Sequence, residues 1–135
     1  MWTGRCRCRA NTSGANLPGA GSEPDGEVHS HYVQATWTLT GESRGYKAAT
    51  GVPGMITPAG GRGAIELVAK AERIEFDVDG SRAQTARAYI AGANWYANRN
   101  VKLMLNLSHV DTSALAAPGA DDDGFAISAR VQVAF

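Results

Sequence analysis

Residues 125–135 read FAISARVQVAF, and along the whole stretch apolar side chains alternate with polar or small ones. Because successive side chains of a β-strand point to opposite faces, this pattern predicts a strand with one apolar and one wet face. Its length is close to the about ten residues with which a tilted strand crosses a bilayer. We therefore expect a transmembrane strand. The apolar positions are Phe125, Ile127, Ala129, Val131, Val133 and Phe135.

Upstream of this strand, four segments repeat the alternation, with turn-forming stretches between them: His31–Thr40, Ala64–Phe76, Thr85–Tyr96 and Val101–Val110. Each has roughly ten residues, whereas strands of soluble sheets are usually nearer to about five or six. The sequence therefore predicts an all-β fold. We expect a segment of an antiparallel transmembrane β-barrel, with about five meander strands that form an incomplete barrel.

Strand directions follow once the last strand is taken to run inward and to end at the periplasm. Asn98–Asn100 is then a tight periplasmic turn and Asp111–Gly124 a longer extracellular loop, as such barrels prefer. The segment Glu42–Gly63 is then periplasmic but long, and we expect it either to fold into the lumen or to contain a short strand pair. The aromatic residues expected at the membrane interfaces are Trp37 and Trp95 at the periplasmic end and Phe76 and Phe125 near the outer end.

Charge and hydropathy exclude several classes of protein. Thirteen basic and thirteen acidic residues cancel. Such a balance gives no overall field that would recruit nucleic acid, so we expect no nucleic-acid partner. No apolar run reaches the roughly eighteen residues that a transmembrane helix needs, and such a helix is therefore excluded.

Residues 1–27 differ from the rest of the chain, because they are rich in Gly, Ser, Pro, Asn and Arg and show neither the hydrophobic period of a strand nor that of a helix. We interpret them as a disordered or non-native N-terminal segment, and residues 28–135 as the C-terminal strands of a barrel. The first residues lack the apolar core of roughly seven residues that a secretory signal needs. Because a barrel protein has to be exported, we expect the chain to be a fragment that lacks its true start.

Polar side chains on the wet face of the predicted strands are the candidates for lining a pore: Glu66, Lys70, Glu72, Lys102, Asn106 and Arg130. Rings of fixed charge set the selectivity of ion pores. The alternative is that the lysines and glutamates pair with each other or solvate the wall, since opposite charges cancel in the local field. Alternation places Arg87 on the lipid-facing side of its predicted strand, near the extracellular end, where a long side chain can reach the lipid head groups.

No cluster of residues indicates catalysis or a metal site. Cys6 and Cys8 are followed by no second ligand pair, and the pair His29–His31 lacks a third ligand. Ser108 and His109 point to opposite faces of their strand, so they cannot form a nucleophile–base pair. We therefore expect no metal, no cofactor and no enzyme activity.

Four blocks of this sequence resemble the end of the phosphate-selective porin O and P family. They are YVQATWTLTGESRGYK (residues 32–47), GAIELVAKAERIEF (63–76), NWYANRNVKLMLNLSHVD (94–111) and the closing FAISARVQVAF. The blocks occur in the family's order and cover about residues 28–135. Residues 1–27 do not resemble the strands that precede these blocks in the family.

This resemblance implies a bacterial outer-membrane barrel of about sixteen strands, usually a homotrimer, that passes anions or small solutes passively. By the same resemblance the solutes are similar to phosphate or polyphosphate, and the partners include outer-membrane lipid and lipopolysaccharide. Val131, Val133 and the terminal Phe135 look like the signal that the barrel-assembly machinery reads. The family's arginine-rich pore constriction lies in earlier parts of the barrel, so we assign it to no residue here.

A soluble antiparallel β-domain that binds a ligand or a partner is the alternative interpretation. It predicts that Leu103, Leu105 and Leu107 form one wall of a packed core and that the domain exposes little apolar surface. The barrel interpretation predicts the reverse, because there the apolar face meets lipid.

Overall fold

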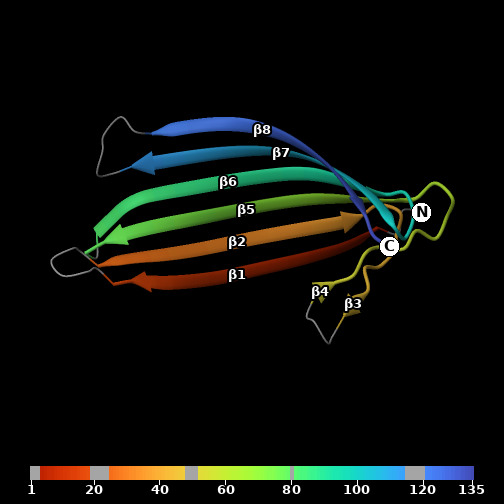
Figure 1. The fold of residues 1–135 in the computed structure, drawn as a ribbon, viewed down its shortest axis with the longest axis horizontal. Coiled ribbons are helices and arrows are strands. Elements are labelled where there is room, and N and C mark those ends of the chain that lie inside the picture. Colours follow the sequence, from red (N-terminus) through yellow and green to blue (C-terminus); the bar gives the residue numbers. More distant parts are fainter. Residues whose placement is uncertain (1–3, 19–24, 48–51, 80, 115–120) are drawn as a thin grey trace.

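The computed structural model describes residues 4–18, 25–47, 52–79, 81–114 and 121–135. Six long strands form one antiparallel sheet in the order β1-β2-β5-β6-β7-β8, and β3 and β4 form a separate pair (Figure 1). The strands are β1 (Arg5–Leu17), β2 (Gly26–Thr38), β3 (Tyr46–Lys47), β4 (Val52–Pro53), β5 (Ala64–Val78), β6 (Ser81–Tyr96), β7 (Val101–Ala114) and β8 (Asp122–Val133).

The predicted all-β antiparallel meander is confirmed, since every long strand pairs with the next long strand along the chain. The long strands have 12 to 16 residues, more than the sequence pattern suggested. The pairing of β5 with β6 has one register shift, between Phe76 and Asp77. Within the described ranges, no helix is long and apolar enough to cross a membrane.

β1 is the main difference from the sequence-based prediction, which treated residues 1–27 as disordered or non-native. Arg5–Leu17 pairs with β2 over its whole length, from Arg5 opposite Thr38 to Leu17 opposite Gly26, so the sheet has six strands. Most side chains of this strand are polar or small, so apolar and polar residues hardly alternate there. A ladder of backbone hydrogen bonds with β2 forms regardless of that pattern.

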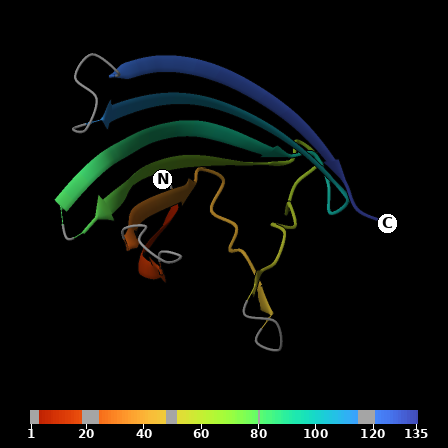
Figure 2. The same ribbon diagram turned by 60° about the vertical axis from the view of Figure 1, so that its left-hand side comes forward.

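The sheet is arched, and the chain between β2 and β5 lies on its hollow side (Figure 2). We call this side the concave face; it carries Glu66 and Tyr96, which contact that connecting chain. Alternation along each strand and the register between strands show which other side chains share this face. In the paired central parts of the strands they are the even-numbered residues of β2, β5, β6, β7 and β8, and the odd-numbered residues of β1. The opposite side is the convex face.

Large apolar side chains on the convex face are exposed. Leu103, Leu105 and Leu107 are 36%, 55% and 48% exposed, so they do not form the wall of a packed core that the soluble-domain alternative requires. The buried apolar cluster among the described residues is small and lies instead at the edge of the concave face; it consists of Ile56, Ala64 and Tyr96. An apolar convex face is what the barrel interpretation predicts.

The connection between β2 and β5 contains the β3–β4 pair, which confirms the short strand pair expected within residues 42–63. Its ends are held at the sheet, because the Leu39 N–H donates to the Ile65 carbonyl (2.9 Å) and the Ile65 N–H to the Thr40 hydroxyl (3.3 Å). Gly63 closes the connection with a φ of +80°, a conformation that favours glycine. The segment is thereby directed over the concave face.

The tight turn expected at Asn98–Asn100 is also confirmed. The Asn98 side-chain oxygen accepts hydrogen bonds from the backbone N–H groups of Asn100 (2.8 Å) and Val101 (2.9 Å). An asparagine that binds its own following backbone in this way is a common means of closing a turn.

Candidate functional site

A buried carboxylate, Glu66, organises the polar centre of the concave face. Its Oε2 atom accepts hydrogen bonds from Arg44 (2.5 Å), from the Asn94 amide (2.9 Å) and from the Tyr96 hydroxyl (2.9 Å). Glu66 is only 2% exposed, and Tyr96 1%. Burial of a charge is costly unless it is paired and hydrogen-bonded, and both conditions are met here.

Arg44 joins the β2–β5 connection to the sheet through this carboxylate. Its Nη2 atom also donates to the Tyr96 hydroxyl (2.5 Å), and its buried Nε atom has no hydrogen-bond partner within the described chain. The Lys102 Nζ atom lies 5.0 Å from the centroid of the same Tyr96 ring. Arg44 and Lys102 thus place two cations around one carboxylate.

Glu42 lies in the same connection and is partly buried. Burial opposes its charge, but hydrogen bonds from Thr40, from its own backbone and from the Ala59 N–H outweigh that effect, and the pKa of Glu42 lies below its usual value. Glu42 therefore stays charged at neutral pH and helps to hold residues 39–63 together through Ala59 (3.2 Å).

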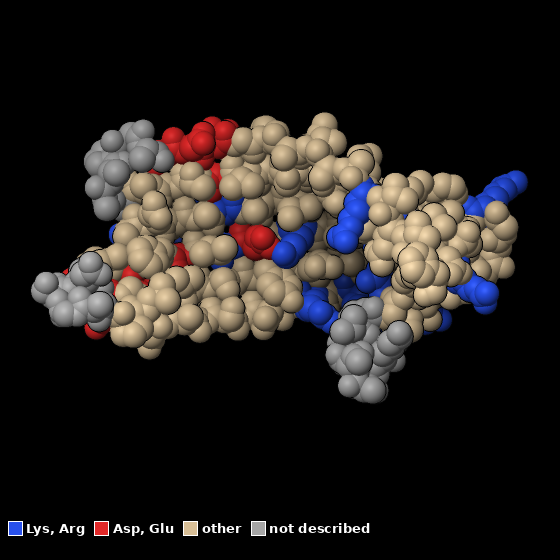
Figure 3. Space-filling model, in the orientation of Figure 1, with Lys and Arg blue, Asp and Glu red and all other residues tan. Residues whose placement is uncertain are grey.

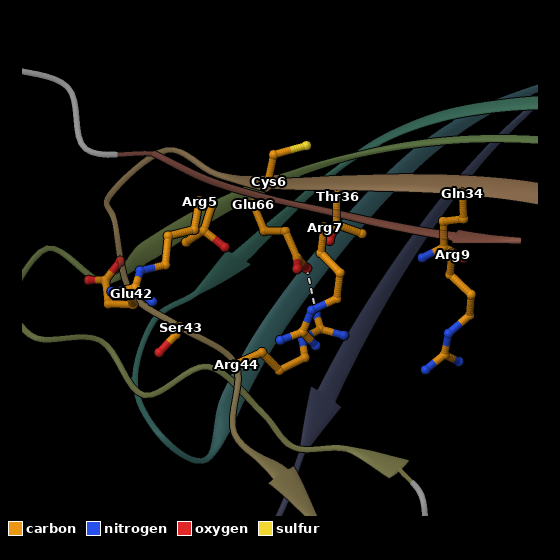
Figure 4. A pocket seen from close by; sticks show the side chains of 11 residues that line it. Arg5, Cys6, Arg7, Arg9, Gln34, Thr36, Glu42, Ser43, Arg44 and Glu66 are labelled. Carbon is orange, nitrogen blue, oxygen red and sulfur yellow. Dashed lines mark hydrogen bonds and ion pairs between the residues drawn. The ribbon is translucent and has the colours of Figure 1, made fainter.

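Three arginines of β1 line a hollow of about 530 Å³ between the sheet and this connection. Figure 4 shows the side chains of Arg5, Arg7 and Arg9 on the side of the sheet where Arg44 and Glu66 lie, while Cys6 points to the other side. The alternation of β1 causes this arrangement, because every second side chain of a strand shares a face. The other residues that line the hollow are Gln34, Thr36, Thr38, Glu42 and Ser43.

The hollow has an excess of positive charge. Glu66 is neutralised by Arg44 (2.5 Å), whereas Arg5, Arg7 and Arg9 form no ion pair with any residue that the structure describes. Figure 3 shows Lys and Arg atoms around the hollow beside the β3–β4 pair, and Asp and Glu atoms nearer to the opposite end of the strands. With Glu42 counted as well, four arginines and two glutamates line the hollow, so its net charge is positive. A hollow with a net charge of one sign concentrates counter-ions of the other sign.

All six predicted pore-lining residues have the parity of the concave face, but they differ in surroundings. Lys70 forms an ion pair with Glu72 and lies 5.1 Å from the Tyr32 ring centroid, so these two charges cancel locally, as the alternative predicted. Glu66 is bound to Arg44. Arg130 is exposed on the edge strand β8 and pairs across the ladder with Met104. Their role in lining a pore stays a prediction; the six are Glu66, Lys70, Glu72, Lys102, Asn106 and Arg130.

Three of the four predicted interface aromatics are exposed large apolar residues: Trp37 (44%), Trp95 (43%) and Phe125 (73%). Phe76 differs, because alternation along β5 places it on the concave face with Glu66 and Lys70. Its ring lies beside Gly26, where an added Cβ would come within 3.2 Å of the ring. The register of β5 thus gives no support to Phe76 as an interface residue.

The end of the chain is open to its surroundings. Phe135, Val133 and Val131 are 113%, 57% and 65% exposed, and the Ala134 N–H donates to the Asn100 carbonyl (2.8 Å). The outer edge of β8 has no neighbouring strand in the described sheet. A free edge and exposed apolar side chains are the features through which a strand is recognised by strand addition. The assignment of Val131, Val133 and Phe135 as an assembly signal stays a prediction.

No group of three His, Cys, Asp or Glu side chains in the described ranges is arranged to hold a metal ion. Cys6 and Cys8 are free and exposed. His31 instead contacts Thr12 (Nδ1 to Oγ1, 3.1 Å), and His29 contacts Glu27 (3.5 Å).

Sequence reasoning missed the cationic hollow. Arg5, Arg7 and Arg9 occur at every second position, and that spacing alone would place them on one face of a strand. Arg44, Asn94 and Tyr96 carried no such signal, because they meet Glu66 only through the fold of the β2–β5 connection and the pairing of β5 with β6.

Comparison with known proteins agrees with this geometry. The family described as phosphate-selective porin O and P matches residues 1–135. The match includes residues 1–27, in which the sequence alone shows no resemblance to the family. Porin O of Pseudomonas aeruginosa is 31% identical in an alignment 121 residues long, which covers 82% of this chain and 28% of the relative. The chain thus spans somewhat more than a quarter of the length of the curated relative it matches. Porins of the bacterial outer membrane are channels and not enzymes, and this chain belongs to the phosphate-selective porin O and P family.

Proposed function

We propose that this chain supplies a section of the wall of an outer-membrane pore through which small anions, phosphate among them, diffuse passively. The observation that carries the proposal is the hollow on the concave face, where Arg5, Arg7 and Arg9 lack carboxylate partners within the described chain. The convex face, with its exposed Leu105 and Ile127, then meets lipid.

Guanidinium groups suit this task. They are always charged, and their planar fork matches the oxygens of phosphate. Arg5, Arg7 and Arg9 recur at steps of two residues, about 7 Å along the strand. An anion can therefore pass from one cation to the next without leaving a favourable potential. Binding that is weak and repeated along the path is what conduction requires.

The β2–β5 connection narrows the passage in this proposal. Arg44, fixed by Glu66 and Tyr96, lines the same hollow as the arginines of β1 (Figure 4). The rest of the pore comes from further strands, because β1 and β8 lie at opposite edges of the described sheet and do not pair with each other. The parent pore is a homotrimer in this proposal, oriented with Trp37 and Trp95 at the periplasmic interface.

Ion selectivity of a complete barrel tests the proposal. In a chimeric barrel, the portion of Porin O that matches this chain is replaced by the chain itself. We expect the reversal potential in a potassium chloride gradient to show anion preference. The combined change Arg5→Gln, Arg7→Gln and Arg9→Gln should reduce the anion-to-cation permeability ratio by roughly tenfold, since it removes three neighbouring charges.

The matched control is Arg99→Gln, which removes one cation from the turn at residues 97–100, outside the hollow. It should leave the selectivity within about twofold of the unmodified chimera, since an exposed charge at the end of a strand is well screened by salt. An unchanged permeability ratio in the triple variant would refute the proposed role of the three arginines.

A further inference from the structure

We propose that the convex face carries a binding site for the phosphate groups of lipopolysaccharide. The site lies on β2, β5 and β6, in the half of these strands that is remote from the turn at residues 97–100. It is built from the guanidinium groups of Arg73 and Arg87, with the His31 ring beside them. The inference rests on the orientation proposed above, in which this half of the strands faces the outer leaflet.

These side chains form one row across the sheet. His31 pairs with Arg73, and Arg73 pairs with Arg87, so the three lie at the same level on three neighbouring strands. The row two residues nearer to the middle of the strands is apolar and consists of Val33, Ala71 and Tyr89. A shallow groove of about 470 Å³ is lined by both rows. Cations and an apolar floor thus meet in one depression.

The cationic row is incompletely neutralised by the protein. Arg73 and Arg87 stand directly opposite each other, an arrangement that destabilises a sheet unless an anion intervenes. Arg73 binds Glu75 (2.5 Å), but that carboxylate is shared with Arg82 (2.9 Å). The buried Nε atom of Arg73 has no hydrogen-bond partner in the part of the chain that the structure describes.

Arg87 has no ion pair with any described residue, although Asp111 is its cross-strand neighbour on β7. Asp111, and Glu72 in the lining of the groove, are the acidic groups that would compete with a bound phosphate. On the other side of the row, the Nδ1 atom of His31 contacts the Thr12 hydroxyl (3.1 Å), which holds the ring on this face. The groove is therefore lined by polar side chains from β2, β5 and β6.

The level of the row selects the ligand. From Trp95 to Arg87 is eight residues of β6, about 26 Å along the strand. A strand tilt of about 40° reduces this to about 20 Å of height, which places Arg87 within about 5 Å of the upper boundary of an apolar band about 25 Å high. Long cationic side chains at such a boundary reach the head groups. A phosphorylated glycolipid matches both rows at once, with its phosphates on the arginine pair and its acyl chains on Val33, Ala71 and Tyr89. Arginine binds phosphate oxygens in a bidentate way.

Lipid binding to the full chain in neutral-detergent micelles tests the inference at low ionic strength. Fluorescently labelled lipid A, its dephosphorylated form and inorganic phosphate are the three ligands. We expect lipid A to bind roughly tenfold more tightly than its dephosphorylated form, and the double change Arg73→Gln with Arg87→Gln to remove that difference. Arg99→Gln, the same chemical change at the opposite end of the sheet, should keep the affinity within about twofold.

Circular dichroism checks that each variant keeps its strands. If the double variant does not fold, Arg87→Gln alone serves, because Arg87 makes no ion pair with the described chain, and it should weaken lipid A binding by roughly threefold. Equal binding of lipid A and its dephosphorylated form would overturn the inference, and so would unchanged affinity in a folded variant. Displacement of lipid A by millimolar inorganic phosphate would also overturn it, because the site would then be one for free anions. The selectivity of the chimeric pore does not depend on these residues, so the two proposals can fail separately.

Discussion

Glu66 shows how a single side chain joins an irregular segment to a regular sheet. One carboxylate oxygen accepts hydrogen bonds from Arg44, Asn94 and Tyr96, which lie 22, 28 and 30 residues away in the chain. The three donors satisfy a charge that is almost completely removed from water. The arrangement fixes Arg44, which would otherwise be a mobile surface side chain, at the rim of the cationic hollow.

The change Glu66→Gln should therefore loosen the β2–β5 connection. It removes the negative charge but leaves Arg44 partly buried, and breaking a buried ion pair in this way costs about 3 kcal/mol. We expect the free energy of unfolding in urea to fall by about that amount, and proteolysis within residues 42–63 to become faster.

Glu72→Gln is the matched control for this prediction. Glu72 is 29% exposed at its side chain and pairs with Lys70, which is 28% exposed. Ion pairs of this kind contribute less than about 1 kcal/mol. If the two variants were equally destabilised, Glu66 would not have the organising role described here.

At the scale of elements, Gly63 determines how the β2–β5 connection returns to the sheet. Its φ is +80°, and an added Cβ would lie 2.4 Å from the Tyr96 carbonyl oxygen and 2.6 Å from the Trp95 indole nitrogen. The backbone oxygen cannot move aside without disturbing β6. Trp95 is fixed in turn, because its indole N–H donates to the Arg62 carbonyl (3.1 Å).

Gly63→Ala should lower the free energy of unfolding by about 1–3 kcal/mol, because it adds both a strained φ and a steric clash. Gly60→Ala is the control, since nothing lies within 4 Å of a Cβ at that position. We expect it to change stability by less than about 0.5 kcal/mol. Urea unfolding of the two variants in micelles measures the difference, and similar curves for both would contradict the proposed role of Gly63.

Alternation predicted β2, β5, β6, β7 and β8 because one face of each strand has to meet an apolar medium. It failed for β1, where Cys6, Cys8 and Ala10 face outward and arginines face inward, so no strong apolar face marks the strand. The contacts of Arg44 could not be predicted either, since they depend on the path of an irregular connection. The hollow is formed by β1 and Arg44, and the sequence predicted neither the strand nor the contacts of Arg44. The cations that the sequence suggested as pore-lining, Lys70 and Arg130 among them, are therefore not those of the hollow.

The whole molecule is an open sheet with one apolar and one polar face. β1 and β8 are its edges, and each leaves backbone groups without a strand partner in the described chain. Unpaired backbone groups are costly in lipid, and the smallest bacterial barrels have about eight strands. In the proposed pore, further strands complete the wall to which these two faces belong.

The chain by itself should consequently form no pore of defined size. We expect planar bilayers that receive the purified chain to show either no conductance or irregular steps. The chimeric barrel should give steps of uniform size under the same conditions. Reproducible single channels from the chain alone would contradict this expectation.

The central claim is that the convex face meets lipid and the concave face meets water. Nitroxide labels placed singly at residues 103–108 of β7 in the chimeric barrel test it most directly, once Cys6 and Cys8 have been replaced by serine. Collisions with oxygen, which is concentrated in lipid, should be frequent at Leu103, Leu105 and Leu107. Collisions with a water-soluble nickel chelate should be frequent at Met104, Asn106 and Ser108. The predicted result is that the collision rate of each reagent alternates from one residue to the next, with the maxima for oxygen at the minima for the nickel chelate. Equal access of the nickel chelate to all six positions would contradict the account.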